Sequence, residues 1–184
     1  MKLARFLALA VALGFGISWL ASAAADDKDI KAAVLKLATA LEKNDKEAAK
    51  KLVDELKKED LEHVMELMKP PAKNKDAFDV VKEGIEMKLN ALSKKAGDVK
   101  ASAADYEKMA HIVAAIAEVA SVKCPVGSKM GDKDPKAWAE WVNEMKDGAK
   151  ALGEAAKAKD AKKVNAAAKK ITGACNNCHG VFRD

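Results

Sequence analysis

The residues best suited to chemistry lie near the carboxyl end of the chain: Cys175, Cys178 and His179. Cys-x-x-Cys-His is the attachment motif of a c-type haem, in which both cysteine sulfurs form thioether bonds to vinyl groups of the porphyrin. The residue after the second cysteine is then close enough to supply a neutral imidazole nitrogen to the iron. The spacing therefore predicts one covalently bound haem c, with His179 as the proximal ligand.

Closely spaced cysteines also occur in structural disulfides, thiol oxidoreductases and zinc sites. No strand pattern of the thioredoxin type precedes this motif, and no second pair of cysteines or histidines has the spacing needed to complete a tetrahedral zinc site. The histidine directly after Cys178 favours haem. The alternative is a helical scaffold without haem, in which Cys175 and Cys178 form a redox-active disulfide.

Apolar residues around the motif recur at alternating steps of three and four, which is the spacing of one face of an α-helix. They are Ala161, Val164, Ala168, Ile171, Cys175, Cys178 and Phe182. Both thiols thus continue the face expected to pack against other helices, and His179 lies at its edge. A helix here can present two sulfurs and one imidazole to a single flat macrocycle.

The amino-terminal segment has the pattern of a secretory signal peptide. Lys2 and Arg5 give a basic start, an apolar run covers 6–20, and Ala-x-Ala cleavage sites end at Ala23 and Ala25. Cleavage after Ala25 leaves 159 residues with a net charge of +3, enough for one domain with its own core. We expect a periplasmic or secreted protein with no stable membrane anchor after cleavage; the alternative is an uncleaved anchor.

The rest of the chain is rich in alanine and lysine, sparse in glycine and proline, and without period-two alternation, which predicts an all-α fold. Helices are expected at about 30–43, 45–69, 76–96, 102–121, 135–158 and 161–182. Asp45 can cap the second, which has a break near 59–60; Ser102 or Asp105 can cap the fourth, and Asp134 caps the fifth. Short connections favour antiparallel neighbours. We expect a helical hairpin at 26–75 packed on an up-down four-helix bundle at 76–184.

The carboxyl-terminal half resembles a known family. The ending Cys-Asn-Asn-Cys-His-Gly-Val-Phe-Arg at 175–183, preceded by a helix that carries Trp138 and Trp141, is similar to the end of cytochrome c′ and related class II c-type cytochromes. The segment Cys-Pro-Val-Gly-Ser at 124–128 resembles that family's loop between its second and third helices. The resemblance covers about residues 76–183, and the helices before it have no counterpart in the short family members.

This resemblance implies a four-helix bundle with one haem c bound by Cys175 and Cys178, and with His179 as the proximal iron ligand. By position, Arg183 is implied to be the basic residue near the proximal side of the haem. The family's distal residue is often on the first bundle helix, and homodimers are common among its members.

The sixth position of the iron has several candidates. Met87 would lie on the helix at 76–96, although it projects about 180° from Phe78 and so away from the main apolar stripe. Met65 and Met68 lie on an apolar face, where methionine more often fills the core. An apolar distal pocket without a ligand is the alternative.

Other residues of interest have mainly structural interpretations. His63 and His111 lie on polar helix faces and are expected to be exposed rather than ligands. Trp138 and Trp141 are expected to anchor the core; the alternative is that one of them lines the haem edge. Cys124 is a third, unpaired cysteine, either buried and inert or able to cross-link two chains.

The sequence therefore predicts a monohaem cytochrome that exchanges single electrons with redox partner proteins and is not an enzyme. The alternative function is a five-coordinate haem protein that binds small gases such as nitric oxide. The modest positive charge, with lysines interleaved with acidic residues, argues against nucleic-acid binding. No Ser-His-Asp arrangement, phosphate loop or paired-carboxylate motif is apparent.

Overall fold

The computed structural model describes residues 26–183, which form seven α-helices and no β-strand, so the prediction of an all-α fold is confirmed. The helices are α1 (Asp27–Glu42), α2 (Lys46–Leu56), α3 (Leu61–Glu66), α4 (Ile85–Lys94), α5 (Val99–Ser121), α6 (Pro135–Lys157) and α7 (Ala161–Phe182). The predicted signal peptide at 1–25 lies outside the described residues.

Aspartate side chains begin six of these helices. Each accepts a hydrogen bond from a backbone N–H of the first turn; the caps are Asp26, Asp45, Asp60, Asp98, Asp134 and Asp160. The predicted starts after Asp45 and Asp134 are confirmed. The predicted cap at Ser102 or Asp105 is wrong, because Asp98 accepts from the Ala101 N–H at 3.1 Å and α5 begins earlier.

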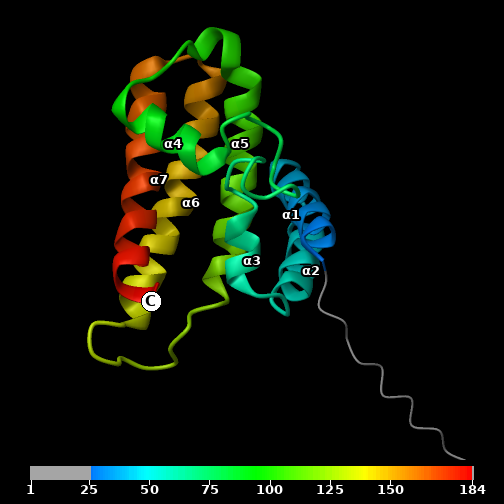
Figure 1. Ribbon diagram of the computed structural model, residues 1–184, viewed down its shortest axis with the longest axis vertical. Helices are drawn as coiled ribbons and strands as arrows, with labels where there is room; N and C mark the ends of the chain where they lie inside the picture. Colours follow the sequence, from blue (N-terminus) through cyan, green and yellow to red (C-terminus); the bar gives the residue numbers. More distant parts are fainter. Residues whose placement is uncertain (1–25, 184) are drawn as a thin grey trace, which may run out of the picture.

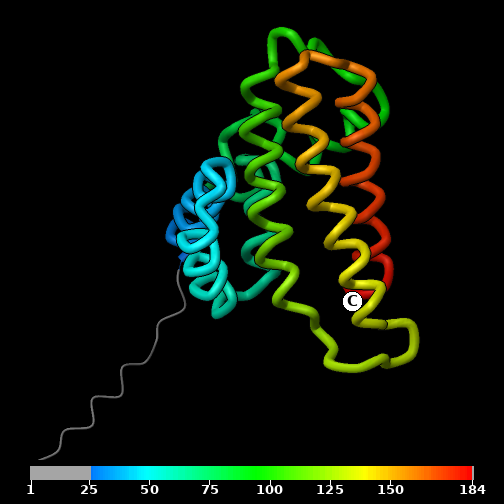
Figure 2. Tube along the Cα trace, turned by 180° about the vertical axis from the view of Figure 1, so that it is seen from behind, coloured from blue at the N-terminus to red at the C-terminus, as the bar shows by residue number. Residues whose placement is uncertain are grey.

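The long helices pack in chain order, α5 against α6 and α6 against α7, while α4 packs on α7 (Figure 1). Helix α1 packs on both α2 and α5, and α3 contacts α1 and α5. Helix α5 is apolar around most of its circumference, with Met109, Ile112, Val113 and Ile116 all buried, as its position between these neighbours requires. The loop between α5 and α6 lies at the same end of the molecule as the end of α7 (Figure 2).

Helices α6 and α7 approach closely at Gly148. A Cβ atom at this position would lie 2.7 Å from Cγ1 of Ile171 and 3.2 Å from its backbone nitrogen. The absent side chain therefore lets the backbone of α6 approach the helix that carries the Cys-x-x-Cys-His motif.

The segment 76–84 is not helical, although a helix was predicted to begin at Asp76. Phe78 and Val81 are buried as their spacing predicted, but in an irregular loop that folds back on the end of α3. The Phe78 N–H donates to the Leu67 carbonyl at 2.9 Å instead of continuing a helical ladder. Helix α4 begins only at Ile85.

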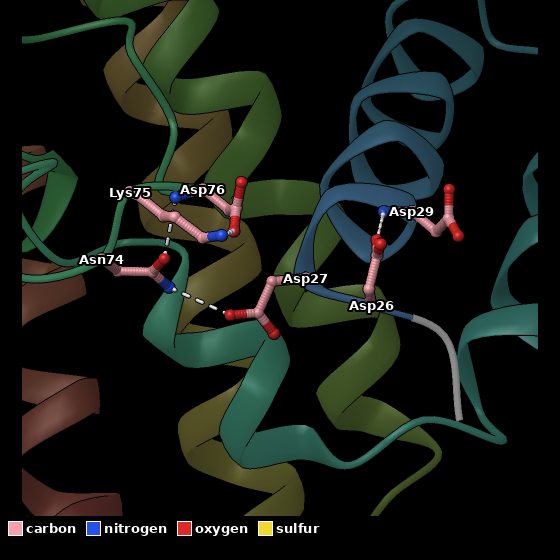
Figure 3. Close-up of polar contacts among 6 residues, drawn as sticks. All are labelled: Asp26, Asp27, Asp29, Asn74, Lys75 and Asp76. Atoms are coloured by element: carbon pink, nitrogen blue, oxygen red, sulfur yellow. Dashed lines mark hydrogen bonds and ion pairs between the residues drawn. The ribbon is translucent and has the colours of Figure 1, made fainter. Parts of the chain in front are cut away.

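Polar contacts tie this loop to the start of α1 (Figure 3). The Asn74 side chain accepts from the Asp76 N–H at 2.9 Å, which closes a local turn, and donates to the Asp27 carboxylate at 3.5 Å. The Lys31 ammonium donates to the Ala77 carbonyl at 2.8 Å. The Ala77 carbonyl thus accepts from a distant lysine, whereas in a helix from Asp76 it would accept from a backbone N–H of the next turn.

Gly84 joins the loop to α4 at a point where the chain meets itself. Its backbone has φ 80° and ψ 155°, and an added Cβ would lie 2.5 Å from the Pro70 nitrogen. Two residues later the Glu86 N–H donates to the Met68 carbonyl at 3.1 Å. The start of α4 is therefore fixed on the end of α3.

Candidate haem-attachment site

The motif lies on α7, where both thiols continue the inner face of the helix as their spacing predicted. Val164, Ala168 and Ile171 are fully buried on that face, and Cys175 and Cys178 are half-buried at its continuation. Of these two, Cys175 packs against the main hydrophobic core. The motif is therefore held by a rigid helix whose first three turns are anchored in the core.

Cys178 packs against a second, smaller cluster, at the end of the molecule where α5 and α7 end and α6 begins. Its buried members are Ala120 of α5 with Trp138 and Val142 of α6, and we call these three residues the Trp138 cluster. The partly buried residues packed on it are Leu61, Met65, Cys124, Cys178 and Phe182. Side chains from α3, α5, α6 and α7 and from the α5–α6 loop thus pack on one cluster, and one thiol of the motif is among them.

Trp138 organises this cluster. It is 5 % exposed, and its indole N–H donates to the Ala120 carbonyl at 3.0 Å. Its ring meets that of Phe182 edge-on, with centroids 5.1 Å apart, and Trp141 contacts Phe182 in the same way at 6.1 Å. Both tryptophans therefore act as the predicted core anchors, and Trp138 belongs to the cluster on which Cys178 packs.

Burial determines the protonation state of both motif thiols. It raises the pKa of Cys175 to about 11, with a smaller contribution from the neighbouring Cys178. It also raises the pKa of Cys178 to about 11, with Cys124 contributing next. At neutral pH both are thiols rather than thiolates, unlike the activated cysteines of redox enzymes.

His179 lies at the surface of α7, next to the two half-buried thiols. Partial burial lowers its pKa, the charge of Arg183 lowers it further, and the carboxylate of Glu86 on α4 acts in the opposite direction. The imidazole is therefore neutral at neutral pH, which is the form that binds a metal. Arg183 lies close enough for its charge to act on His179 and also on Glu66 at the end of α3.

Two methionines occupy different positions relative to this site. Met87, the sequence-based candidate for the sixth ligand, is 53 % exposed on α4 and belongs to neither buried cluster. Met65 of α3 is half-buried and packs against the Trp138 cluster together with Cys178. The sequence pattern favoured core filling for Met65, because methionine on an apolar helix face more often fills the core. Nothing in the chain near residue 65 indicates which helix ends will pack against it.

The remaining candidates are placed as follows. His63 is exposed as predicted, whereas His111 on α5 is half-buried rather than exposed. Cys124 is a free, half-buried cysteine whose thiol donates to the Val126 carbonyl at 3.2 Å.

Two surface hollows of about 550 and 440 Å³ lie along α2, and none of their lining residues belongs to the motif.

The donor set fits a c-type haem. Two thiols and a neutral imidazole lie within one helical turn, beside apolar and aromatic side chains. Within residues 26–183, no group of three or more His, Cys, Asp or Glu side chains could hold a metal ion. Haem needs no such group, because the porphyrin supplies four nitrogens and the protein supplies only axial ligands and thioether sulfurs.

Comparison of the chain with protein-family models, curated proteins and solved structures finds no match. The resemblance to class II c-type cytochromes therefore depends on the residues of this chain alone.

Among the helices of residues 26–183, none combines the length and the apolar composition that a membrane span needs.

Proposed function

We propose that the chain is a periplasmic or secreted monohaem c-type cytochrome that transfers single electrons to and from partner proteins. The observation that carries the proposal is the pair of half-buried thiols on the inner face of α7, followed at once by a neutral histidine. The haem, when bound, supplies an iron that cycles between ferrous and ferric states. Cys175 and Cys178 would hold the porphyrin through thioether bonds, and His179 would supply an imidazole nitrogen to the iron.

The protonation states support haem attachment over a thiol oxidoreductase. A catalytic dithiol needs a thiolate near neutral pH, whereas burial raises the pKa of both cysteines here to about 11. A cysteine that forms a permanent thioether bond has no such requirement in the folded protein.

The packing supports the finer prediction that α4 to α7 form an up-down four-helix bundle. Consecutive long helices are neighbours, and α4 closes on α7. Trp138 at the start of α6 bonds Ala120 at the end of α5, as expected for helices that run in opposite directions. In this arrangement α1 and α2 form the additional amino-terminal hairpin, and α1 packs it on the bundle through α5.

Covalent attachment is directly testable. We expect the protein from a host that matures c-type cytochromes to be coloured and to carry the mass of one haem after denaturation. The C175S and C178S variants should each lose one thioether bond, and the double variant should release all haem in denaturant. The matched control C124S should keep both bonds. A colourless wild-type protein of unmodified mass would disprove the proposal.

The sixth position distinguishes electron transfer from the gas-binding alternative. Met65 is the better placed thioether, because it shares the Trp138 cluster with Cys178. We therefore expect a low-spin reduced spectrum that is unaffected by carbon monoxide in the wild type. M65L should become high-spin and bind carbon monoxide.

The matched control for this test is M87L, because Met87 is more than half exposed. It should retain the wild-type spectrum. If the wild type and M65L are equally high-spin and equally reactive with carbon monoxide, the gas-binding function is the correct one.

A further inference from the structure

Helix α3 is the part of the amino-terminal segment that reaches the candidate site. It packs on α5 (Figure 1), and its half-buried Leu61 and Met65 pack against both the main core and the Trp138 cluster. With only six residues it is too short to be stable by itself, so its placement depends on contacts with the rest of the chain. The position of the Met65 thioether therefore depends on how the two ends of α3 are held.

Main-chain hydrogen bonds hold the carboxyl end of α3. The Leu67 carbonyl accepts from the Phe78 N–H at 2.9 Å. The Met68 carbonyl accepts from the Glu86 N–H at 3.1 Å, at the close approach that Gly84 permits. The end of α3 is thus fixed to the loop at 76–84 and to the start of α4.

The amino end of α3 is held by the side chain of Lys123, which lies just after α5. The Lys123 ammonium donates to the Lys57 carbonyl at 3.0 Å and also to the Glu59 carbonyl. Glu59 directly precedes Asp60, the cap of α3. A charged donor makes a stronger hydrogen bond to a carbonyl than a neutral donor does. The ammonium therefore fixes the point from which α3 starts.

The main chain of Lys123 is bound in turn to the Trp138 cluster. Its N–H donates to the Ala120 carbonyl at 3.1 Å, and the same carbonyl accepts from the Trp138 indole at 3.0 Å. Ala120 and Trp138 are two of the three buried members of that cluster. Lys123 thus joins the start of α3 to the cluster on which both Met65 and Cys178 pack.

We propose that Lys123 is a positioning residue, which holds α3 on the Trp138 cluster and thereby places Met65 for the sixth position of the iron. This inference rests on the proposed function, and on Met65 as the ligand in particular. It gives the amino-terminal segment a role in the site, because α3 supplies one ligand while the bundle supplies the motif and the lysine that holds α3. Loss of the ammonium should leave the fold intact, since the carboxyl end of α3 keeps its own bonds, but should loosen the placement of Met65.

The test compares two lysines whose ammonium groups each donate to the main chain of a distant segment. K123M removes the donor and keeps most of the apolar side-chain stem, whereas K123R keeps a charged donor. K31M is the matched control, because the Lys31 ammonium donates to the Ala77 carbonyl at 2.8 Å, in the loop at 76–84 rather than at the start of α3.

Two measurements follow each variant. In the unloaded chain we expect K123M to speed amide exchange in α3 roughly tenfold, the change expected when a hydrogen bond from a charged donor is lost, while exchange in α6 stays unchanged. In the haem-loaded protein K123M should show part of the high-spin, carbon monoxide-binding change of M65L, and K123R should restore the wild-type spectrum. K31M should keep both the wild-type spectrum and the wild-type exchange in α3.

Either of two results overturns the inference about Lys123. An unchanged exchange rate in α3 of K123M means that the ammonium does not hold the helix, and a K123M spectrum no more altered than that of K31M means that it does not position Met65. Failure of the proposed function is recognised without any variant of Lys123: the wild type lacks haem, or the wild type and M65L have the same spectrum. The two failures are therefore distinguishable.

Discussion

Replacing Gly84 with alanine is expected to destabilise the protein by roughly 2 to 5 kcal/mol. Two costs add at this position. The backbone has φ 80° and ψ 155°, a conformation that is essentially confined to glycine. The new Cβ would also lie 2.5 Å from the Pro70 nitrogen and 2.7 Å from the Lys69 carbonyl carbon. These are main-chain atoms, so no side-chain rotation can relieve the contact.

The effect should extend beyond local strain. Gly84 lies where the end of α3 meets the start of α4, and the bond from Glu86 to Met68 depends on that approach. We expect G84A to lower the midpoint of urea unfolding monitored by helical circular dichroism. Amide exchange should increase most in α4 and in the loop before it.

Gly153 provides the control for this prediction. It is helical and buried on α6, and its added Cβ would meet only the Ala110 methyl at 3.6 Å, an ordinary contact. G153A should therefore stabilise the protein by about 0.5 to 1 kcal/mol, because alanine favours the helix over glycine. Equal unfolding midpoints for G84A and G153A would contradict the close approach at Gly84.

Replacing Trp138 with alanine is the second change with a large expected effect, a loss of about 3 to 5 kcal/mol. The indole is buried between α5, α6 and α7, contacts Phe182 edge-on, and bonds the Ala120 carbonyl at 3.0 Å. Its removal leaves a cavity at the centre of the Trp138 cluster. Chemical denaturation of the unloaded chain measures this loss without any contribution from haem.

Two further variants separate the causes. W138F keeps most of the apolar volume and removes the indole N–H; the Ala120 carbonyl still accepts from the Lys123 N–H, so we expect a loss of only about 1 kcal/mol from the missing bond. W141A removes a ring of the same type that is only half-buried, and should cost clearly less than W138A. If W141A is the more destabilising of the two, Trp138 is not the anchor of the cluster.

Much of the fold follows from local sequence signals. Asp45 and Asp134 begin helices where the chain predicts them, because a short acidic side chain satisfies N–H groups of the same first turn. The inner face of α7 is likewise readable from spacing, since residues three and four apart must share a face. These interactions connect residues within one or two turns, so they do not depend on the rest of the molecule.

The loop at 76–84 shows where this reasoning fails. Phe78, Val81 and Ile85 have helical spacing and are buried, yet only Ile85 is in a helix. The deciding interactions are the bonds from Phe78 to Leu67 and from Asn74 to Asp27, which join segments far apart in the chain. An apolar pattern predicts which residues will be buried, but both a helix and an irregular loop can bury them.

The candidate site also depends partly on local sequence and partly on long-range packing. The sequence by itself determined the three motif residues and their common helix, because adjacent positions on one helix have a fixed geometry. Only the tertiary structure decided what surrounds them: Met65 rather than Met87 packs against the Trp138 cluster, as Cys178 does, and the charge of Glu86 acts on His179. Those neighbours come from helices joined through long loops, and their approach depends on packing contacts that no local spacing encodes.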